Sequence, residues 1–409
     1  MKILLVNNHH KLLGGAEKYY FDLTKLLTSK GHQVAHFSTQ DPENVSSKWS
    51  RYFVKKLDFS RNNFRSFHSK ITNMFYSTSA KKSIARLLDD FKPNIVHLQN
   101  IYYYISPAIL SEIKKRKIPI VQTLHDYQLI TPSVTLFHNG KVCEITKPHN
   151  YYKALLHKCV KDSYVASLMA VLASYLQRVF NFYDKYVDIF IAPSLFLKNK
   201  FVEYGFEPGR IVHISNFIET QPTTNNLKST TNPRFVLFFG RLLEFKGVNL
   251  ILEAAKVLPQ INFKIAGDGP VEKGLIKLTK KLKLKNVEFL GRLKENQLKR
   301  VILRSMFCVV PSIWYENQPY SIMEAFSLGK PVVASRTGGI PETVREGESG
   351  LLFEPGNVKE FSDKILKFWK NSGKVKTMGK NAKALIKNKY LSDKYYKKLM
   401  AIYQSLITT

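Results

Sequence analysis

The chain passes twice through a succession of short apolar runs separated by segments with helical periodicity, and this pattern limits the possible folds more than any other feature. In the first half we expect a helix over Ala16–Ser29, because Gly31 follows the end of the periodic segment. The apolar runs expected to be strands are Ile3–Asn7, Val34–Ser38, Ile95–Leu98, Ile120–Thr123 and Ile189–Ala192. Short apolar strands that alternate with helices predict a parallel sheet covered on both faces.

The pattern restarts after a polar stretch in the middle of the chain. The change begins near Asn216, and Thr220–Pro233 has the composition of a weakly structured junction. The strands expected after it are Phe235–Phe239, Phe263–Ala266, Val287–Leu290, Phe307–Val310 and Val332–Ala334. Three helical stretches follow Val358. Because 409 residues are too many for one hydrophobic core, the sequence predicts an α/β protein of two domains.

The segment Pro311–Glu342 places two carboxylates around the start of a helix. Pro319 does not fit inside a helix, so Glu316 is expected in the preceding loop. Ser321 is expected to cap the helix that carries Glu324, and Gly329 to end it. Two carboxylates beside a helix N-terminus can hold a sugar nucleotide, because sugar hydroxyls donate to carboxylates and phosphates bind helix N-termini.

The same residues also fit a purely structural role. Ser321-x-x-Glu324 is the spacing of a capping box, in which Glu324 would only accept a hydrogen bond from the backbone N–H of Ser321. Two other segments favour a ligand site. Phe235–Gly247 is a buried strand followed by a basic loop, and Ile265–Pro270 is a strand end with two glycines.

Taken together, these motifs resemble those of the family 4 retaining glycosyltransferases of the GT-B fold, also called glycosyl transferases group 1. The similarity runs from Met1 to about the last helix. The motifs that carry it are Glu316-x7-Glu324, Gly240-Arg241 with Lys246-Gly247, Gly267-Asp268-Gly269-Pro270 and Gly338-Gly339-Ile340-Pro341-Glu342. They are specific for the family and say little about the particular sugar.

The resemblance implies two Rossmann-like, doubly wound domains that face each other across a cleft. On this basis residues 1–215 form an acceptor-binding domain and residues 216–390 a nucleotide-sugar-binding domain. Residues 391–409 are expected to form a helix that packs back on the N-terminal domain, with Asp393–Leu406 as its core. The implied activity is transfer of a sugar, with retention, from a nucleotide-diphosphate sugar to a glycan or polyprenyl-linked acceptor of a cell-surface polysaccharide.

For catalysis the resemblance implies four residues, Arg241, Lys246, Glu316 and His125. Arg241 and Lys246 would grip the departing diphosphate, Glu316 would lie close to the donor sugar, and His125 would face that sugar from the end of a strand. The chain contains no Asp-x-Asp, so we expect no metal and no cofactor. The two basic residues could equally be surface charges of a very basic protein.

The remaining donor-site residues are also assigned by resemblance. Glu324 would bind the ribose, and Asp126 could orient His125. UDP- or GDP-linked donors are favoured over ADP-linked ones. Gly267 also fits a plain turn. The residues expected around the phosphates, sugar and base are Gly14, Gly15, Gly267, Arg292, Leu293, Pro319, Tyr320 and Ser321.

The formal net charge of +32 requires anionic partners. Val45–Leu88 and Tyr151–Tyr186 interleave cations with aromatic residues, which is typical of an anionic membrane face or of single-stranded nucleic-acid binding. The aromatics could instead be core residues. The resemblance favours the membrane over nucleic acid, because many family members glycosylate lipid-linked carriers.

The expected compartment is the cytoplasm, at the inner face of the cell membrane. Met1-Lys2 leads directly into a strand, no apolar run reaches the length of a spanning helix, and three cysteines give no disulfide framework. Cys143 and Cys159 are expected to be free thiols. The alternatives to a retaining transferase are a GT-B sugar-nucleotide epimerase or inverting transferase, and a nucleic-acid-binding protein.

Overall fold

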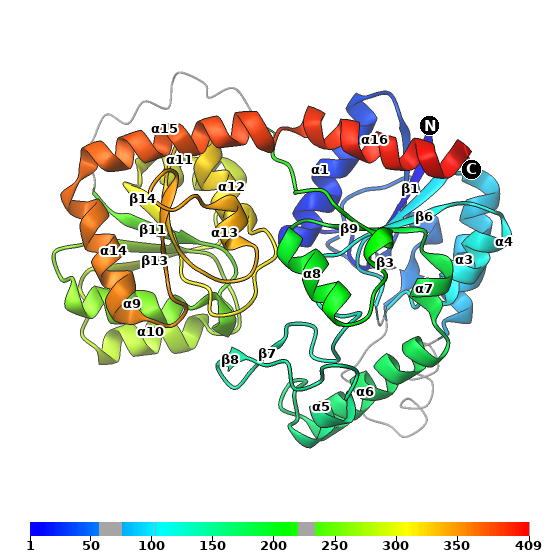
Figure 1. Ribbon diagram of the computed structural model, residues 1–409, viewed down its shortest axis with the longest axis horizontal. Coiled ribbons are helices and arrows are strands. Elements are labelled where there is room, and N and C mark those ends of the chain that lie inside the picture. The colour runs from blue at the N-terminus through cyan, green and yellow to red at the C-terminus, as the bar shows by residue number, and fades with distance from the viewer. Residues whose placement is uncertain (57–75, 103, 220–233, 409) are drawn as a thin grey trace. The chain divides into compact units, whose positions relative to one another are not determined.

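The computed structural model describes residues 1–56, 76–102, 104–219 and 234–408 (Figure 1). The chain divides into two compact units. Unit 1 comprises residues 1–136, 144–215 and 395–409, and unit 2 comprises residues 137–143 and 216–394. The expected junction Thr220–Pro233 and part of the basic segment Val45–Leu88 lie outside the described residues.

Unit 1 is built on a six-stranded parallel sheet with the order β10-β9-β6-β5-β1-β2. Every residue of β5 and β6 is buried, which explains why these strands read as continuous apolar runs. The six strands are β1 (Lys2–Val6), β2 (Gln33–Phe37), β5 (Ile95–Leu98), β6 (Ile120–Thr123), β9 (Ile189–Ala192) and β10 (Ile211–His213).

The helices of unit 1 surround this sheet (Figure 1). The first begins directly after Gly14 and ends before Gly31, whose φ of +81° suits glycine. They are α1 (Gly15–Ser29), α3 (Thr78–Phe91), α4 (Ala108–Lys115), α5 (Tyr152–Leu156), α6 (Tyr164–Val179), α7 (Phe182–Tyr186) and α8 (Leu195–Glu203). Two short strand pairs lie outside the six-stranded sheets: β3 (Thr39–Gln40) with β4 (Val54–Lys55) in unit 1, and β7 (Phe137–His138) with β8 (Lys141–Val142) in unit 2.

Unit 2 repeats the architecture with the order β13-β12-β11-β14-β15-β16, again all parallel. The strands are β11 (Val236–Phe239), β12 (Phe263–Ala266), β13 (Val287–Gly291), β14 (Phe307–Val310), β15 (Val332–Ser335) and β16 (Gly350–Phe353). The helices are α9 (Val248–Val257), α10 (Glu272–Lys281), α11 (Glu295–Arg304), α12 (Tyr320–Ser327), α13 (Ile340–Thr343), α14 (Val358–Lys370) and α15 (Ser372–Lys389). Apolar clusters fill both faces of the sheet.

The last helix, α16 (Ser392–Thr408), belongs to unit 1 from Tyr395 onward. Its Tyr403 hydroxyl lies 2.6 Å from Nδ1 of His97, in the middle of β5, and Tyr395 contacts the hydroxyl of Tyr19 in α1. All four side chains are buried. Polar contacts inside a core fix the position of a helix because each lost partner is costly. The expected α/β fold with two Rossmann-like domains and a returning C-terminal helix is therefore confirmed.

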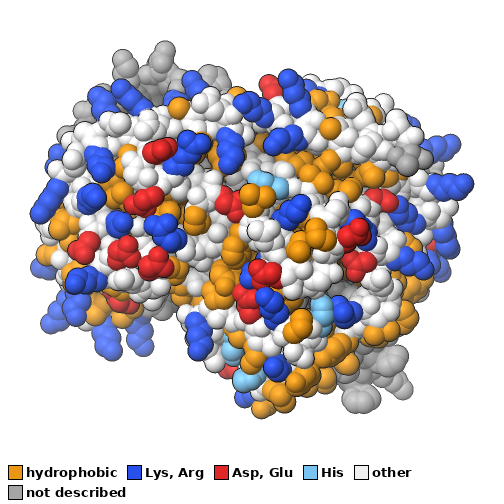
Figure 2. Space-filling view, viewed as in Figure 1, with side chains coloured by type: hydrophobic (Ala, Val, Ile, Leu, Met, Phe, Trp, Pro, Cys, Tyr) orange, Lys and Arg blue, Asp and Glu red, His pale blue; other side chains and the backbone are white. Residues whose placement is uncertain are grey.

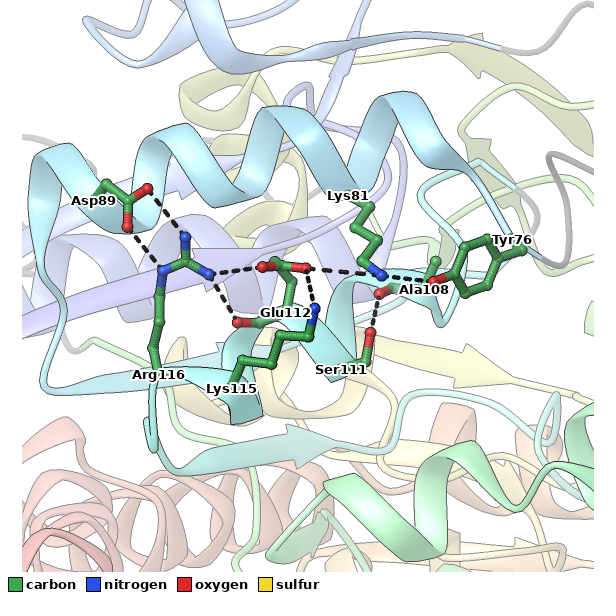
Figure 3. A network of polar contacts seen from close by, with 8 residues as sticks. All are labelled: Tyr76, Lys81, Asp89, Ala108, Ser111, Glu112, Lys115 and Arg116. Carbon is green, nitrogen blue, oxygen red and sulfur yellow. Dashed lines mark hydrogen bonds and ion pairs between the residues drawn. The ribbon is translucent and has the colours of Figure 1, made fainter.

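The basic residues are spread over the surface of both units (Figure 2). In unit 1 the pairing of α3 with α4 shows how the few acidic residues are used (Figure 3). Arg116 contacts Asp89 at 2.8 Å and Glu112 at 3.0 Å. Glu112 also forms ion pairs with Lys81 and Lys115. The acidic end of α3 is thus a structural ion-pair network.

The ten expected strands all exist, with ends shifted by at most one residue. Of the strands in the two six-stranded sheets, the prediction missed β10 and β16, which lie at sheet edges. β10 is only partly buried, so its residues need not all be apolar. β16 is fully buried, and its edge position does not explain why it was missed. In the described part of Val45–Leu88, Tyr52 and Phe53 are buried and Trp49 packs on Phe91. The core interpretation is correct for these aromatics.

Candidate active site

The candidate donor site lies at the carboxyl ends of the central strands of unit 2. The loop after β11 carries Arg241 and Lys246, and the loop after β14 carries Glu316. The two loops touch, because the N–H of Ile313 donates to the carbonyl of Phe245 at 2.9 Å and the rings of Phe245 and Trp314 lie 4.4 Å apart. Parallel strands end together at one edge of the sheet, which brings these separate segments into contact.

Lys246 and Glu316 form an ion pair in which the carboxylate is buried and the lysine side chain is partly buried. Nζ of Lys246 lies 2.6 Å from Oε1 of Glu316, and the same oxygen accepts a hydrogen bond from the Ser312 hydroxyl at 2.6 Å. Glu316 is only 4% exposed. The ammonium also lies 5.4 Å from the centre of the Trp314 ring, within the range of a cation–π contact. Two residues that were assigned separate roles are therefore in direct contact.

This environment keeps Glu316 ionised. Burial alone would raise its pKa, but the Lys246 ammonium and the Ser312 hydroxyl outweigh that effect and hold the pKa of Glu316 below its ordinary value of 4.5. The pair therefore carries both charges at neutral pH. A buried ion pair of this kind is sensitive to loss of either partner, since the remaining charge would be left without compensation.

The Gly338-Gly339 motif clamps the backbone of Glu316. The N–H of Gly339 donates to the Glu316 carbonyl at 2.6 Å. Gly338 has a φ of +57°, and a Cβ at this position would lie 2.1 Å from the same carbonyl oxygen. Only glycine can occupy such a position without moving the loop. The motif thus fixes the carboxylate of Glu316 from the backbone side.

Arg241 differs from Lys246 in its surroundings. It is exposed, and within the described ranges its side chain makes no ion pair. Arg292 is also exposed and lies 4.0 Å from Asp268, a distance at which two solvated charges interact weakly. Both guanidinium groups are therefore accessible to an anionic ligand. Leu293 follows on the same loop and is partly buried.

The prediction that Ser321 caps α12 is wrong. The helix begins at Tyr320 with Pro319 as its N-cap, so Ser321 is the second residue of the helix and caps nothing. Pro319 takes this place because its fixed φ suits an N-cap with extended ψ, and no helical N–H is lost there. The capping box with Glu324 is therefore absent. Glu324 is partly buried one turn into the helix, and Gly329 follows its end with a φ of +72°, as expected.

Gly267 has a structural reason of its own. Its φ is +140°, and a Cβ would lie 1.9 Å from the carbonyl oxygen of Gly240. Glycine is therefore required where the loops after β11 and β12 cross closely. The crossing lies at the carboxyl ends of the strands, which is where nucleotides bind in open α/β sheets.

In unit 1, His125 follows β6 and is held by a residue that the sequence reading missed. Its Nε2 lies 2.6 Å from Oε1 of Gln99, and its ring packs edge-on against Tyr19 at 5.1 Å. Burial lowers the pKa of His125 to about 3, so the imidazole is neutral at physiological pH. It can polarise or hydrogen-bond a ligand but brings no positive charge of its own.

Asp126 is oriented by other groups. Its Oδ1 accepts from the N–H of Gln128 at 2.9 Å, and the side chain of Asn100 also bonds it. Burial raises the pKa of Asp126 to about 7, and the Glu17 carboxylate contributes to the rise. Gly14 is the N-cap of α1 and Gly15 its first residue, and Glu17 follows in the first turn. Gln99 is thus an observed partner of His125, and the orienting role of Asp126 stays a prediction.

The missed residues share one signal in the sequence. Gln99 is the first residue after β5, and Ser312 is the second residue after β14. Polar residues at the carboxyl ends of buried parallel strands are candidates for ligand or supporting contacts. Gln318, in the loop before α12, was also missed. Its Oε1 accepts a hydrogen bond from the backbone N–H of Asn216 at 2.6 Å.

Among residues 1–56, 76–102, 104–219 and 234–408, no three His, Cys, Asp or Glu side chains are grouped so that they could hold a metal ion. The three cysteines are free, as expected, and Cys308 is buried.

Family models match both units of the chain. The model described as Glycosyltransferase Family 4 matches residues 13–222, and the model described as Glycosyl transferases group 1 matches residues 220–385. The first of these alone covers more than half of the 409 residues. The chain belongs to glycosyltransferase family 4. It is a glycosyltransferase with the GT-B fold, and the paired sites described above lie in its two Rossmann-like domains.

Individual relatives extend the comparison. The chain is 34% identical over 172 residues to an uncharacterized glycosyltransferase, MJ1178, of Methanocaldococcus jannaschii, covering 42% of this chain and 48% of that protein. It is 22% identical over 419 residues to the N-acetyl-alpha-D-glucosaminyl L-malate synthase of Bacillus anthracis, covering 100% and 98%. The structure of Anabaena HepE in complex with UDP-glucose matches with a TM-score of 0.66 at 19% identity, covering 99% and 100%.

Proposed function

We propose that this glycosyltransferase moves a sugar, with retention at the anomeric carbon, from a nucleotide-diphosphate sugar to a glycan or polyprenyl-linked acceptor in cell-surface polysaccharide synthesis. The observation that carries the donor half of this proposal is the buried Lys246–Glu316 pair at a strand end, close in the chain to the start of α12. Membership in the family favours transfer over the epimerase and nucleic-acid-binding alternatives.

The chemistry assigned to the site is neutralisation of the leaving group. A nucleoside diphosphate departs with negative charge, and a preorganised cation lowers the barrier most where that charge develops. The ammonium of Lys246 has three donors, of which one is directed to Glu316, so the others can bind a phosphate oxygen. Exposed Arg241 can bind the same diphosphate with its planar fork.

The contacts of Glu316 suggest a positioning role in addition to a contact with the donor sugar. Its carboxylate accepts from Lys246 and Ser312, and its carbonyl from Gly339. These contacts fix the ammonium in one place before a donor arrives. Preorganisation of this kind supplies rate because no rearrangement is needed during the reaction.

A uridine nucleotide is the first donor to test. The structure of HepE, which has the same fold, was solved with UDP-glucose. We propose a UDP-linked sugar as the donor of this chain because of that similarity. A GDP-linked sugar remains the second choice. The acceptor and the peripheral position at the inner face of the membrane are proposed on the basic surface and its exposed aromatics. No helix in the described ranges is long and apolar enough to cross a bilayer.

A panel of nucleotides and an analysis of the product test the donor and the stereochemistry. UDP, GDP and ADP and their sugars should be compared by thermal shift, and we expect the true donor nucleotide to raise Tm by mass action. Proton NMR should then show that the product keeps the anomeric configuration of the donor. Activity should be unchanged in EDTA. An inverted product, or activity restored only by Mn²⁺, would contradict the proposal.

Glu324→Gln should weaken binding of the nucleotide about tenfold, because a charge-assisted hydrogen bond to the ribose is reduced to a neutral one. Calorimetric titration with the nucleotide alone measures this loss. Glu288→Gln is the matched control, since Glu288 is an exposed carboxylate in the same unit that pairs with Lys264 at 2.7 Å. Unchanged affinity in Glu324→Gln would show that Glu324 only supports the helix.

A further inference from the structure

Helix α6 of unit 1 is oriented with its large apolar side chains toward solvent. Its buried residues are mostly small: Ser167, Ala170, Val171, Ala173 and Ser174. Apart from Arg178, its exposed residues are large and apolar: Tyr164, Val165, Leu168, Leu172 and Val179. A helix at a water-facing surface normally shows the opposite arrangement. The exposed face of α6 is therefore built for contact with something other than water.

The five exposed apolar residues form one continuous stripe. With about 100° of rotation per residue, they fall within an arc of about 100° on the helix surface. Val179, at the end of the helix, is 75% exposed, and Phe180 directly after it is 58% exposed. Of the fifteen large apolar side chains that are exposed in the described part of the chain, eight lie between Tyr152 and Phe180. We call these eight residues the α5–α6 stripe.

The residues of the α5–α6 stripe are Tyr152, Leu156, Tyr164, Val165, Leu168, Leu172, Val179 and Phe180. Hydrophobic side chains gather over α5 and α6 in the space-filling view as well (Figure 2). An exposed apolar patch of this kind marks an interaction surface. The helix pair is held by a small core of its own, formed by Tyr151, Ala154 and Val171.

Cations flank the stripe along the chain, and one of them, Lys158, contacts it. Five Lys and Arg side chains lie between residues 151 and 186 against two acidic ones, Asp162 and Asp184. The ammonium of Lys158 lies 4.6 Å from the centre of the Tyr164 ring at the beginning of α6. The helix itself contains no acidic residue and only one basic residue, Arg178, near its end. The basic residues are Lys153, Lys158, Lys161, Arg178 and Lys185.

We propose that α6 is a membrane-binding helix that lies in the interface of a bilayer containing anionic lipids, with the α5–α6 stripe toward the acyl chains. An apolar face bordered by cations is the pattern of helices that lie in the plane of the interface. The helix has 16 residues and is therefore about 24 Å long, which is shorter than the roughly 30 Å hydrocarbon core. It can lie in the interface but cannot span the bilayer. The proposal rests on the proposed function only for the identity of the acceptor that the enzyme would meet there.

A second copy of the chain is the competing occupant of the stripe. Charge favours the bilayer, because two stripes facing each other would bring their bordering cations together. The basic border instead complements the negative surface of phosphatidylglycerol-containing membranes. Self-association is therefore treated as an outcome of the test.

The double variant Leu168→Glu/Leu172→Glu tests the proposal in the full-length chain. Wild-type protein is co-sedimented with vesicles of phosphatidylcholine alone and with vesicles that also contain phosphatidylglycerol. We expect binding to the anionic vesicles and a loss of roughly tenfold or more in the double variant, since two apolar contacts become charged. The matched control is Val257→Glu, an exposed apolar residue at the end of α9 in unit 2, which is 61% exposed and should bind as wild type does.

Further readouts decide between the outcomes. Circular dichroism melts and nucleotide binding check that the double variant is folded, and neither readout depends on sugar transfer. Unchanged vesicle binding by the folded double variant, or wild-type protein that binds neither vesicle, would overturn the proposal. A wild-type dimer in sedimentation velocity that becomes a monomer in the double variant would assign the stripe to a subunit interface. Wild-type protein that binds the anionic vesicles but transfers no sugar from any nucleotide-sugar donor would contradict the proposed function alone.

Discussion

Lys246→Ala should lower kcat roughly a hundredfold, which corresponds to about 3 kcal/mol of barrier, while the protein remains folded. The ammonium is already held at the end of β11 by the Trp314 ring and by the carboxylate of Glu316, which the Ser312 hydroxyl fixes in turn, so it needs no rearrangement to meet the departing diphosphate. The substitution removes that charge and leaves Glu316 without its counter-charge. Initial rates under saturating donor measure the effect.

A matched variant separates this effect from simple loss of a lysine. Lys264 forms an ion pair of nearly the same length with Glu288, at 2.7 Å, but the Glu288 side chain is 58% exposed, whereas that of Glu316 is 5% exposed. Lys264→Ala should therefore change neither kcat nor Tm appreciably. If Lys246→Ala turns over at the wild-type rate, the basic loop after β11 has no part in the reaction.

Glu316→Gln should lower both stability and turnover. Removing one charge of a buried pair leaves the Lys246 ammonium poorly compensated, and we expect a loss of roughly 3 kcal/mol in the free energy of unfolding. Turnover should fall as well, because Lys246 is no longer held in one position. Denaturant unfolding and steady-state kinetics at neutral pH measure the two losses. Glu288→Gln, which removes one charge of the exposed pair, is the control and should show neither.

The pH dependence of the free energy of unfolding tests whether Glu316 is ionised in the folded protein. Because the folded pKa of Glu316 is lowered, its ion pair contributes full stability above the ordinary value of 4.5, and this contribution is lost as pH falls through the lower folded value. The stability difference between wild type and Glu316→Gln should thus be constant near neutrality and shrink only below pH 4.5. A difference that stayed constant into strong acid would mean that Glu316 is not ionised in the folded protein.

Much of the fold could be predicted because it depends on local patterns. The buried strands of parallel sheets are apolar on both faces, so β5, β6, β11 and β14 could be located from their residues alone. Gly31 and Gly329 mark helix ends because both have positive φ. The family motifs in turn gave the site residues, although their roles remain proposals.

The contacts within the site could not be predicted from the sequence. Lys246 and Glu316 are 70 positions apart, and only the common edge of β11 and β14 brings them together. The same holds for Gln99 and His125, which follow neighbouring strands β5 and β6. The start of α12 was misplaced because Ser321 is the better cap by residue preference, while the fixed φ of Pro319 begins the helix two residues earlier.

Helix α6 shows most clearly where local pattern ends and tertiary structure begins. The sequence alone gives an apolar, weakly charged segment that can form a helix. Only the packing of the folded chain decided that Ala170 and Ser174 are buried and that Leu168 and Leu172 are exposed. The physical reason is that periodicity defines the two faces of a helix, whereas the neighbours available to cover each face are set by the rest of the chain.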